Sequence, residues 1–391
     1  MKIRNKAIIC IILAMAFITQ ILVIPVKAEG SGLDVEARSG LLMEPSTGKI
    51  IFEKNIHEKF APASVTKIMT MLLTMEAIDS GKIKMSDKVV VSENAKKMGG
   101  NGSSSMLLDT GEVRSVEDLI KGVAIASGND AAVALAEYIA GSEDAFVKVM
   151  NKRAEELGMK DTTFKNCHGL STEGHLSSAY DIALMSRELL KHEKILKYSG
   201  TYMETISEGR KQPIGLVNHN KLVRFYKGCD GLKTGFTNEA KYCISATATR
   251  DNIRMLSVIM GAPTYKVRNR DASMLMNYGF SKFESKKVVG KHEDVEKISL
   301  NKKGTKFFFA KANSDLNVIL ERGKQNKITK KCILNETKKE YKKNEIIGHC
   351  EVYVNDSLYG KVPVYSDRDV RTYSILDNIK SNLMNLFDNA I

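Results

Sequence analysis

The sequence predicts an α/β domain followed by a small all-β domain. Up to about residue 285, segments with helical periodicity are interspersed with paired strand patterns. Beyond that point, short stretches of alternating hydrophobicity are separated by Lys, Asn and Gly turns, which is typical of β-structure. A length of 391 residues, with 43% apolar and 27% charged residues, suits a folded soluble protein of two or more domains.

Residues 1–28 have the pattern of an export signal. A basic start precedes the apolar run 7–24, and Val26-Lys27-Ala28 provides a cleavage site after Ala28. The alternative is an uncleaved transmembrane anchor, because the apolar run is nearly long enough to span a bilayer. In both cases we expect the rest of the chain to lie outside the cytoplasm.

The net charge and the cysteine content indicate which partners and which kinds of site the protein can have. Loss of residues 1–28 would remove four basic residues from a formal charge of +13, which leaves a basic protein suited to an anionic cell wall or membrane surface. Export makes nucleic acid an unsuitable partner. The five remaining cysteines match neither a zinc site nor a disulfide framework. Cys332 and Cys350 either pair or stay as free thiols.

The first domain is predicted over residues 29–285. Two strands flank a turn at Ser46-Thr47-Gly48, and two more, 241–250 and 253–262, form an antiparallel hairpin around Asp251-Asn252. The helical patterns cover 64–78, 115–126, 131–140, 180–191 and 265–278.

The second domain is predicted over residues 286–370, and a final helix over 371–391. The stretches KFFFAK, LNVILE, EIIGHCEVYVND and GKVPVYS supply the strands of the second domain. On a helical wheel, residues 375–391 place their apolar side chains on one half, where only Lys380 intrudes. The segment is too polar to span a bilayer. We therefore expect an amphipathic helix that lies in a membrane surface, with packing on the β domain as the alternative.

A Ser-x-x-Lys pattern occurs three times, at Ser46, Ser64 and Ser299. Ser46 falls in a turn and Ser299 in the β-rich region, so only Ser64 opens a predicted helix. There the spacing places Lys67 on the same face one turn later, within reach of the Ser64 hydroxyl. The pair is either a nucleophile with its base, or an N-cap with a solvated lysine.

Two further motifs favour catalysis. Ser127-Gly128-Asn129 separates two predicted helices, and Lys233-Thr234-Gly235 precedes a predicted hairpin. Together with Ser64 and Lys67 they supply a nucleophile, a base, a second hydroxyl, a carboxamide and a cation. Their order and rough spacing are those of the serine acyltransferases that carry S-x-x-K, S-x-N and K-T-G.

On these motifs, and on EPSTGKIIFEKN and CHGLSTEGHLSSAYDIA, the chain resembles the serine-type D-alanyl-D-alanine carboxypeptidases, which are low-molecular-mass penicillin-binding proteins. The resemblance runs from about Asp34 to the C-terminus. It implies a β-lactamase/transpeptidase-like α+β domain with an antiparallel five-stranded sheet and helices on both faces. The smaller β domain and the amphipathic helix would follow.

The resemblance also implies residue roles. Ser64 would be acylated, Lys67 would be its base, and Ser127 would pass a proton to the leaving amine. The substrate would be held by Asn129, Lys233, Thr234, Gly235, Phe236 and Arg268, with the backbone N–H groups of Ser64 and Phe236 as an oxyanion hole. No cofactor or metal is implied, and the histidines at 168, 175 and 219 are expected to be structural.

The expected substrate is a peptidoglycan stem pentapeptide that loses its terminal D-alanine at the outer face of the bacterial membrane. β-Lactam antibiotics would bind covalently. Position 128 is Gly, and no Glu-x-x-Leu-Asn element precedes residue 233, so the acyl-enzyme with penicillin should be long-lived. A β-lactamase or esterase of the same fold and a non-catalytic wall-binding protein are the alternatives.

Overall fold

The computed structural model describes residues 33–371, apart from 101, 207–211, 301–306 and 336–339. The predicted export signal and the predicted helix over 375–391 lie outside these residues. Within the described ranges, no helix combines the length and the apolar character that crossing a membrane requires.

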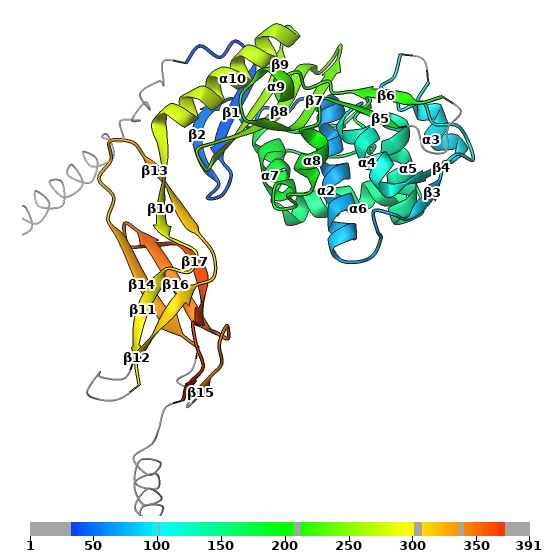
Figure 1. The fold of residues 1–391 in the computed structure, drawn as a ribbon. Coiled ribbons are helices and arrows are strands. Elements are labelled where there is room, and N and C mark those ends of the chain that lie inside the picture. The colour runs from blue at the N-terminus through cyan, green and yellow to red at the C-terminus, as the bar shows by residue number, and fades with distance from the viewer. Residues whose placement is uncertain (1–32, 101, 207–211, 301–306, 336–339, 372–391) are drawn as a thin grey trace, which may run out of the picture. The chain divides into compact units, whose positions relative to one another are not determined.

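Helices dominate the first half of the described chain (Figure 1). They are η1 (Ala63–Thr66), α2 (Lys67–Asp79), α3 (Glu93–Met98), α4 (Val116–Ala124), α5 (Asn129–Ala140), α6 (Glu143–Glu156), α7 (Ala179–Leu189), α8 (Ile195–Ser199), α9 (Leu222–Phe225) and α10 (Tyr265–Lys282).

The strands begin and end as follows. They are β1 (Ser39–Glu44), β2 (Lys49–Lys54), β3 (Lys88–Val90), β4 (Val113–Ser115), β5 (Met203–Ile206), β6 (Ile214–Val217), β7 (Cys229–Thr237), β8 (Lys241–Arg250), β9 (Ile253–Ala262), β10 (Phe283–Val289), β11 (Asp294–Ser299), β12 (Phe307–Ala312), β13 (Leu316–Glu321), β14 (Ile328–Leu334), β15 (Glu340–Tyr341), β16 (Ile346–Val354), β17 (Ser357–Ser366) and β18 (Val370–Arg371).

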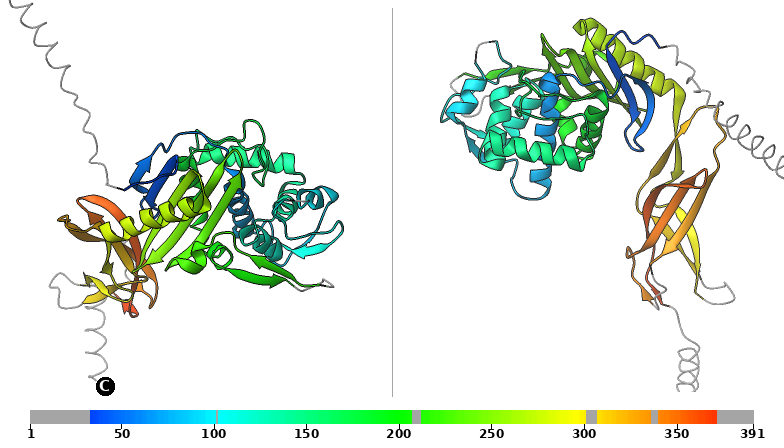
Figure 2. Two further views of the ribbon diagram at one scale, coloured as in Figure 1. Left: turned by 90° about the horizontal axis from the view of Figure 1, so that it is seen from above. Right: turned by 180° about the vertical axis from the view of Figure 1, so that it is seen from behind.

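The expected five-stranded antiparallel sheet is confirmed, with the order β2-β1-β9-β8-β7. Both predicted hairpins belong to it: β1 pairs with β2 and β8 pairs with β9, each antiparallel. Helix α10 covers one face of this sheet and α7 with α2 lies on the other (Figures 1 and 2). Strand β7, which carries Lys233-Thr234-Gly235, is an edge strand.

The five helices predicted in the first domain are present, with shifted ends. Helix α10 continues to Lys282 rather than ending near residue 278. Helix α6 was not predicted, because only Phe146, Met150 and Ala154 are buried on it and this narrow apolar stripe gives a weak periodic signal. The two-stranded sheets β3–β4 and β5–β6 were also missed, since each of their strands is only three or four residues long.

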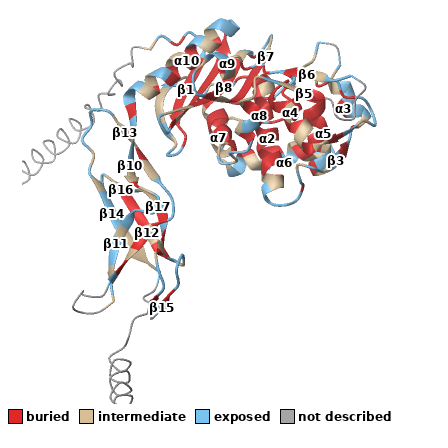
Figure 3. Cartoon of the chain, in the orientation of Figure 1, coloured by how far each residue is buried: buried red, intermediate tan, exposed pale blue. Residues whose placement is uncertain are grey.

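Helix α2 runs through the middle of the helical part of the core. Ten of its residues are buried, from Lys67 to Ala77, so it is enclosed on all sides (Figure 3). Helix α5 is almost as deeply buried, with small residues that allow close packing: Ala131, Ala132, Ala134 and Ala136. The start of α2 is therefore held in place by packing along the whole helix.

The C-terminal strands form a core of their own. Strands β11-β12-β17-β16-β14 make a second antiparallel five-stranded sheet, and Phe308, Val352 and Val364 lie in its hydrophobic cluster. All-β structure in this region is confirmed, whereas the domain limits 285/286 and 370/371 remain predictions. Cys332 lies opposite Cys350 in the β14–β16 register, and both are free thiols.

Neighbouring phenylalanines on β12 test this second core. We expect Phe308→Ala to destabilise the C-terminal unit by about 3–5 kcal/mol, because the ring is fully buried against Tyr341 with centroids 5.3 Å apart. Phe307→Ala removes a side chain that is 40% exposed and serves as the matched control. Urea unfolding followed by limited proteolysis would measure both. Equal losses in the two variants would contradict the assignment of the core.

Candidate active site

Ser64 lies in a 3₁₀ turn and not in the first turn of an α-helix. It belongs to η1, and Lys67 is the first residue of α2. In a 3₁₀ turn, residues three apart are eclipsed, which places Lys67 directly over Ser64. The Nζ atom of Lys67 is 3.1 Å from the Ser64 Oγ. The N-cap position is Pro62, which has no side-chain cap, so the N-cap alternative for Ser64 is wrong.

Lys67 is fully buried, and its amine bonds no carboxylate within the described part of the chain. Its Nζ bonds the Oδ1 of Asn129 at 2.5 Å and the backbone carbonyl of His168 at 2.6 Å. Removal from water lowers its pKa from 10.5 to about 7, although Cys167 and Asp130 offset part of this effect. A neutral amine can donate to the two neutral oxygens and keep its lone pair for the Ser64 hydroxyl.

Ser127-Gly128-Asn129 forms the turn between α4 and α5. Ser127 is buried and has a positive φ of 61°, a backbone conformation that non-glycine residues adopt at a cost. Asn129 begins α5, and its Nδ2 donates to the Oγ of Ser103 at 2.6 Å. The two ends of the Asn129 amide thus join the Lys67 amine to the segment around Ser103.

Asp130 fixes that segment. Its carboxylate accepts hydrogen bonds from the backbone N–H groups of Met106 and Leu108, and from the hydroxyl of Ser105. The backbone N–H of Asn129 in turn donates to the carbonyl of Ser104 at 2.8 Å. These bonds hold residues 103–108 across the start of α5 and place Ser104 at the cavity.

Lys233, Thr234 and Gly235 lie on the edge strand β7. Lys233 is buried, and its Nζ donates to the carbonyl of Thr234 at 3.0 Å. Burial, with Lys67 and Arg268 nearby, holds its pKa well below the usual 10.5. A Cβ on Gly235 would lie 3.0 Å from the backbone N of Ser64 and the O of Pro62, so only glycine lets β7 approach η1 this closely.

Phe236 and Arg268 complete the predicted set. The side chain of Phe236 is 49% exposed and packs on Tyr242 of β8, with ring centroids 4.3 Å apart. Arg268 comes from α10 and is buried, and its guanidinium donates to the Oδ1 of Asn269 at 2.9 and 3.0 Å. Burial lowers the pKa of Arg268 to about 10.

These elements meet around a cavity of about 320 Å³. It is lined by Ser64, Gly102, Ser104, Ser127, His219, Thr234, Gly235, Phe236, Tyr242 and Arg268. None of these ten residues is acidic, and the side-chain amines of Lys67 and Lys233 are buried beside the cavity. The cavity is therefore suited to an anionic ligand next to a serine whose hydroxyl meets a weakly basic amine.

Sequence reasoning missed several contributors. The backbone carbonyl of His168 bonds Lys67, and His219, Ser104 and Tyr242 line the cavity. Histidines are visible in a sequence, but a backbone carbonyl has no residue-type signature. The segment GNGSSS, rich in Gly and Ser, was the available signal for a loop around Ser104.

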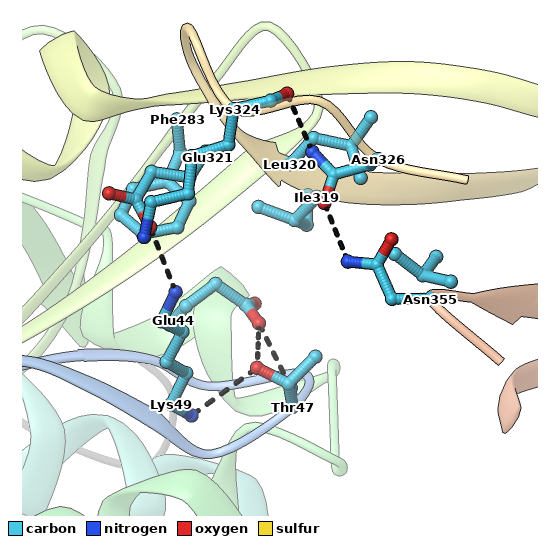
Figure 4. Close-up of a pocket in the computed structure, with 11 residues that line it drawn as sticks. Glu44, Thr47, Lys49, Phe283, Ile319, Leu320, Glu321, Lys324, Asn326 and Asn355 are labelled. Carbon is cyan, nitrogen blue, oxygen red and sulfur yellow. Dashed lines mark hydrogen bonds and ion pairs between the residues drawn. The ribbon is translucent and has the colours of Figure 1, made fainter. Parts of the chain in front are cut away.

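A second cavity, of about 360 Å³, contains none of the predicted site residues (Figure 4). It is lined in part by Glu44, Lys49, Glu321 and Lys324. The charges pair among themselves: Glu321 accepts from Lys49 at 3.3 Å and from Lys324 at 2.8 Å, while Glu44 caps the turn at Thr47. Acidic and basic side chains thus both line the second cavity, whereas the cavity at Ser64 is lined by Arg268 and by no acidic residue.

Comparison with known families and proteins identifies the family of the chain. Residues 25–264 match the family described as "D-alanyl-D-alanine carboxypeptidase", and residues 283–372 match "Penicillin-binding protein 5, C-terminal domain". The chain is 43% identical to the D-alanyl-D-alanine carboxypeptidase DacF of Bacillus subtilis, over 90% of each chain. It is 33% identical to DacA of Escherichia coli, over 84% of this chain and 81% of that one.

Solved structures show the same likeness. Penicillin-binding protein 5 of Haemophilus influenzae superposes with a TM-score of 0.65 at 31% identity, over 87% of this chain and 98% of that one. The peptidoglycan synthesis regulatory factor PBP3 of Streptococcus pneumoniae gives a TM-score of 0.74 at 26% identity, over 87% and 100%. Penicillin-binding protein D2 of Listeria monocytogenes, solved in an ampicillin-bound form, gives 0.56 at 32%, over 63% and 99%.

The effect of burying the Lys233 amine on the free energy of unfolding can be measured. We expect Lys233→Met to raise the free energy of unfolding at pH 7 by about 1–3 kcal/mol, because an apolar chain of similar length replaces an ammonium group that is removed from water. Lys227→Met, at an exposed position, should change it little. Urea unfolding would measure both variants.

The sign of the pH dependence follows from the lowered pKa. Between the folded-state pKa of Lys233 and its usual 10.5, the unfolded chain binds more protons, so the stability of the wild type rises with pH in that range. Lys233→Met should lose this part of the rise. A variant less stable than the wild type would show that the bond to Thr234 outweighs the desolvation cost.

Proposed function

Because the chain belongs to the D-alanyl-D-alanine carboxypeptidase family and is an enzyme of that kind, we propose that it removes the terminal D-alanine from peptidoglycan stem pentapeptides. The reaction would proceed through an acyl-enzyme on Ser64. The observation that carries the proposal is the contact between the Lys67 Nζ and the Ser64 Oγ, which are 3.1 Å apart. The pKa of this lysine is about 7. A substantial fraction of such an amine is neutral near pH 7 and can accept a proton.

Acylation would proceed in two proton transfers. The Ser64 hydroxyl gives its proton to the lone pair of Lys67 as its Oγ attacks the carbonyl carbon of the penultimate D-alanine. The backbone N–H groups of Ser64 and Phe236 would stabilise the negative charge on the carbonyl oxygen. The C–N bond then breaks, and the proton reaches the leaving amine of the terminal D-alanine through Ser127.

Deacylation would reverse these roles. A water molecule attacks the ester carbonyl and gives its proton to neutral Lys67. The bond to the Ser64 Oγ breaks, and Oγ recovers a proton from the lysine, so the enzyme returns to its starting state with the tetrapeptide acid released. No further co-reactant is required.

The excess of cations supports recognition of a free carboxylate. Lys233, Thr234 and Arg268 would bind the terminal carboxylate of the substrate, which separates a carboxypeptidase from an enzyme that cuts within a chain. The Asn129 amide would hold the peptide amide of the substrate. Two backbone groups of β7, an edge strand, would align the stem peptide in an extended conformation.

β-Lactams fit the same site, because their carboxylate and strained amide resemble the acyl-D-alanyl-D-alanine terminus. The relative from Listeria monocytogenes was solved with ampicillin bound. We propose that penicillin acylates Ser64 and that this ester is hydrolysed slowly. A β-lactamase would instead hydrolyse a chromogenic cephalosporin continuously.

We place the enzyme at the outer face of the bacterial membrane, where its substrate is exposed. Export through residues 1–28 and attachment through residues 371–391 follow from the sequence pattern. A single lysine on the apolar half of the C-terminal segment means that apolar burial, more than attraction to anionic lipid, would hold the chain on the surface.

The activity test uses the mature protein and a pentapeptide ending in D-Ala-D-Ala. We expect release of free D-alanine from the wild type and loss of at least about 1000-fold in Ser64→Ala, because the nucleophile is absent. Fluorescent penicillin should label the wild type, but not Ser64→Ala.

Ser46→Ala and Ser299→Ala are matched controls, because they carry the same Ser-x-x-Lys spacing outside the site. Both should keep labelling and turnover. If Ser64→Ala were still labelled by fluorescent penicillin, the nucleophile would be a residue other than Ser64. Labelling without any D-alanine release would favour the non-catalytic wall-binding alternative.

Membrane attachment has its own test. We expect deletion of residues 374–391 to release an active enzyme from liposomes, while high salt alone leaves the full-length chain bound, since apolar contacts are not screened. Co-sedimentation with liposomes, with and without 1 M salt (a Debye length of about 3 Å), measures both. If the full-length chain stays in the supernatant, the segment packs on protein instead.

A further inference from the structure

Residues 165–177 form a loop, here called the 165–177 loop, that lies against the start of α2. Two of its backbone carbonyls accept hydrogen bonds from α2. The carbonyl of Cys167 accepts from the hydroxyl of Thr70 at 2.5 Å, and the carbonyl of His168 accepts from the Nζ of Lys67 at 2.6 Å. The loop therefore supplies one of the two neutral acceptors that hold the Lys67 amine.

His175 connects this loop to the residue before Lys67. The imidazole is buried, and its Nε2 lies 2.8 Å from the Oγ1 of Thr66. Its Nδ1 accepts from the backbone N–H of Lys165 at 3.1 Å. Because a backbone N–H can only donate, Nδ1 carries no proton, so Nε2 carries it and donates to Thr66.

The loop backbone also contacts η1 closely. Gly169 has a φ of +88°, and a Cβ built there would lie 1.8 Å from the carbonyl O of Ala63 and 2.8 Å from the Oγ1 of Thr66. No side chain fits between loop and turn. The hydrogen bond from His175 to Thr66 therefore joins two segments, the 165–177 loop and η1, that are already in close contact. In such tight packing a small displacement of the loop also displaces η1.

We propose that His175 is a positioning residue for the reaction: by donating to Thr66 it fixes the 165–177 loop on η1 and so holds the His168 carbonyl on the Nζ of Lys67. The inference rests on the proposed role of Lys67 as the base. His175 is not among the residues that line the cavity. It acts through the loop and the lysine.

The other end of the loop is fixed separately. The Nδ1 of His168 accepts from the backbone N–H of Leu170 at 3.2 Å, and its Nε2 lies 3.4 Å from the Oε1 of Glu143 on α6. The same carboxylate oxygen accepts from the N–H of Cys167 at 3.1 Å. Each imidazole thus joins a loop N–H to a different neighbouring element, and only His175 reaches the catalytic turn.

Two sets of ionisable groups face these residues. Lys165 and His168 face His175, and burial lowers the pKa of His175 to about 4, so its hydrogen bond to Thr66 persists through the neutral range. The groups that face Lys67 are Cys167, Asp130, Lys233, His168 and His219. Variants at 66 and 175 change none of these five.

Loss of the contact has a defined consequence. If the loop moves off η1, water reaches the Lys67 amine and the desolvation that lowers its pKa is relieved. The pKa then rises toward 10.5, and a smaller fraction of the lysine is neutral at pH 7. Acylation should slow at neutral pH, and the acid limb of its pH profile should move to higher pH.

Four variants separate this effect from a loss of packing. Thr66→Val removes the acceptor hydroxyl with little change in shape. His175→Gln keeps a donor near the position of Nε2, whereas His175→Asn keeps only a group near Nδ1 and cannot reach Thr66. Thr74→Val is the matched control, because this buried hydroxyl on α2 donates to the carbonyl of Thr70 within the same helix and not to the 165–177 loop.

The measurement is the second-order rate constant for labelling by fluorescent penicillin between pH 5 and 10, using full-length protein and normalised to the fraction that titrates with excess penicillin. We expect the wild type to show an acid limb near the Lys67 pKa of about 7. Thr66→Val and His175→Asn should react about 10-fold more slowly at pH 7 and approach the wild-type rate at high pH. His175→Gln and Thr74→Val should stay within about 3-fold of the wild type with an unchanged midpoint.

The outcomes are distinct. Equal midpoints in the wild type, Thr66→Val and His175→Asn would overturn the inference, even if the folded fraction fell. A defect in His175→Gln as large as in His175→Asn would also contradict it, since the donor would then be irrelevant. A wild type that is not labelled at all would instead refute the acyl-enzyme on Ser64.

Discussion

The burial of the Lys67 amine without a carboxylate partner is the constraint on which the rest of the site depends. A carboxylate at this place would hold the lysine as an ammonium ion and remove the lone pair that Ser64 needs. The acceptors are instead neutral oxygens, from Asn129 and from the backbone of His168. To hold an amine in this state, the chain must exclude water around it, and the burial of the N-terminal part of α2 does so.

A second constraint is the distance between η1 and β7. Ser64 must present its backbone N–H and its hydroxyl beside an edge strand whose backbone is open to the cavity. Gly235 permits the approach from the strand side, and Ala63 reaches it with a positive φ of 48°. Ser127 is strained in the same way on the opposite wall. Two residues beside the nucleophile thus have a strained backbone, and the packed helices around them supply the compensating stability.

The three motifs were readable from the sequence because each residue type carries its own chemistry. The β8–β9 hairpin and the long, enclosed helix α2 were readable because their apolar patterns are strong. Helix α6 was not predicted because only a narrow stripe of it is buried. The 3₁₀ turn before α2 was not predicted because helical periodicity does not distinguish a 3₁₀ turn from an α-helical turn. The His168 carbonyl and the Thr66–His175 bond depend on residues about 100 positions apart, and such contacts have no local signature.

The facing cysteines of the second sheet have a consequence for redox chemistry. Disulfide formation begins with a thiolate, so a thiol that stays protonated reacts slowly whatever its thermodynamic tendency. Burial raises the pKa of Cys332 to about 11 and also raises that of Cys350. A pair that lies directly across a strand ladder can therefore remain reduced for long periods in oxidising surroundings, because the sheet withholds the reactive form of both sulfur atoms and not because the partners are far apart.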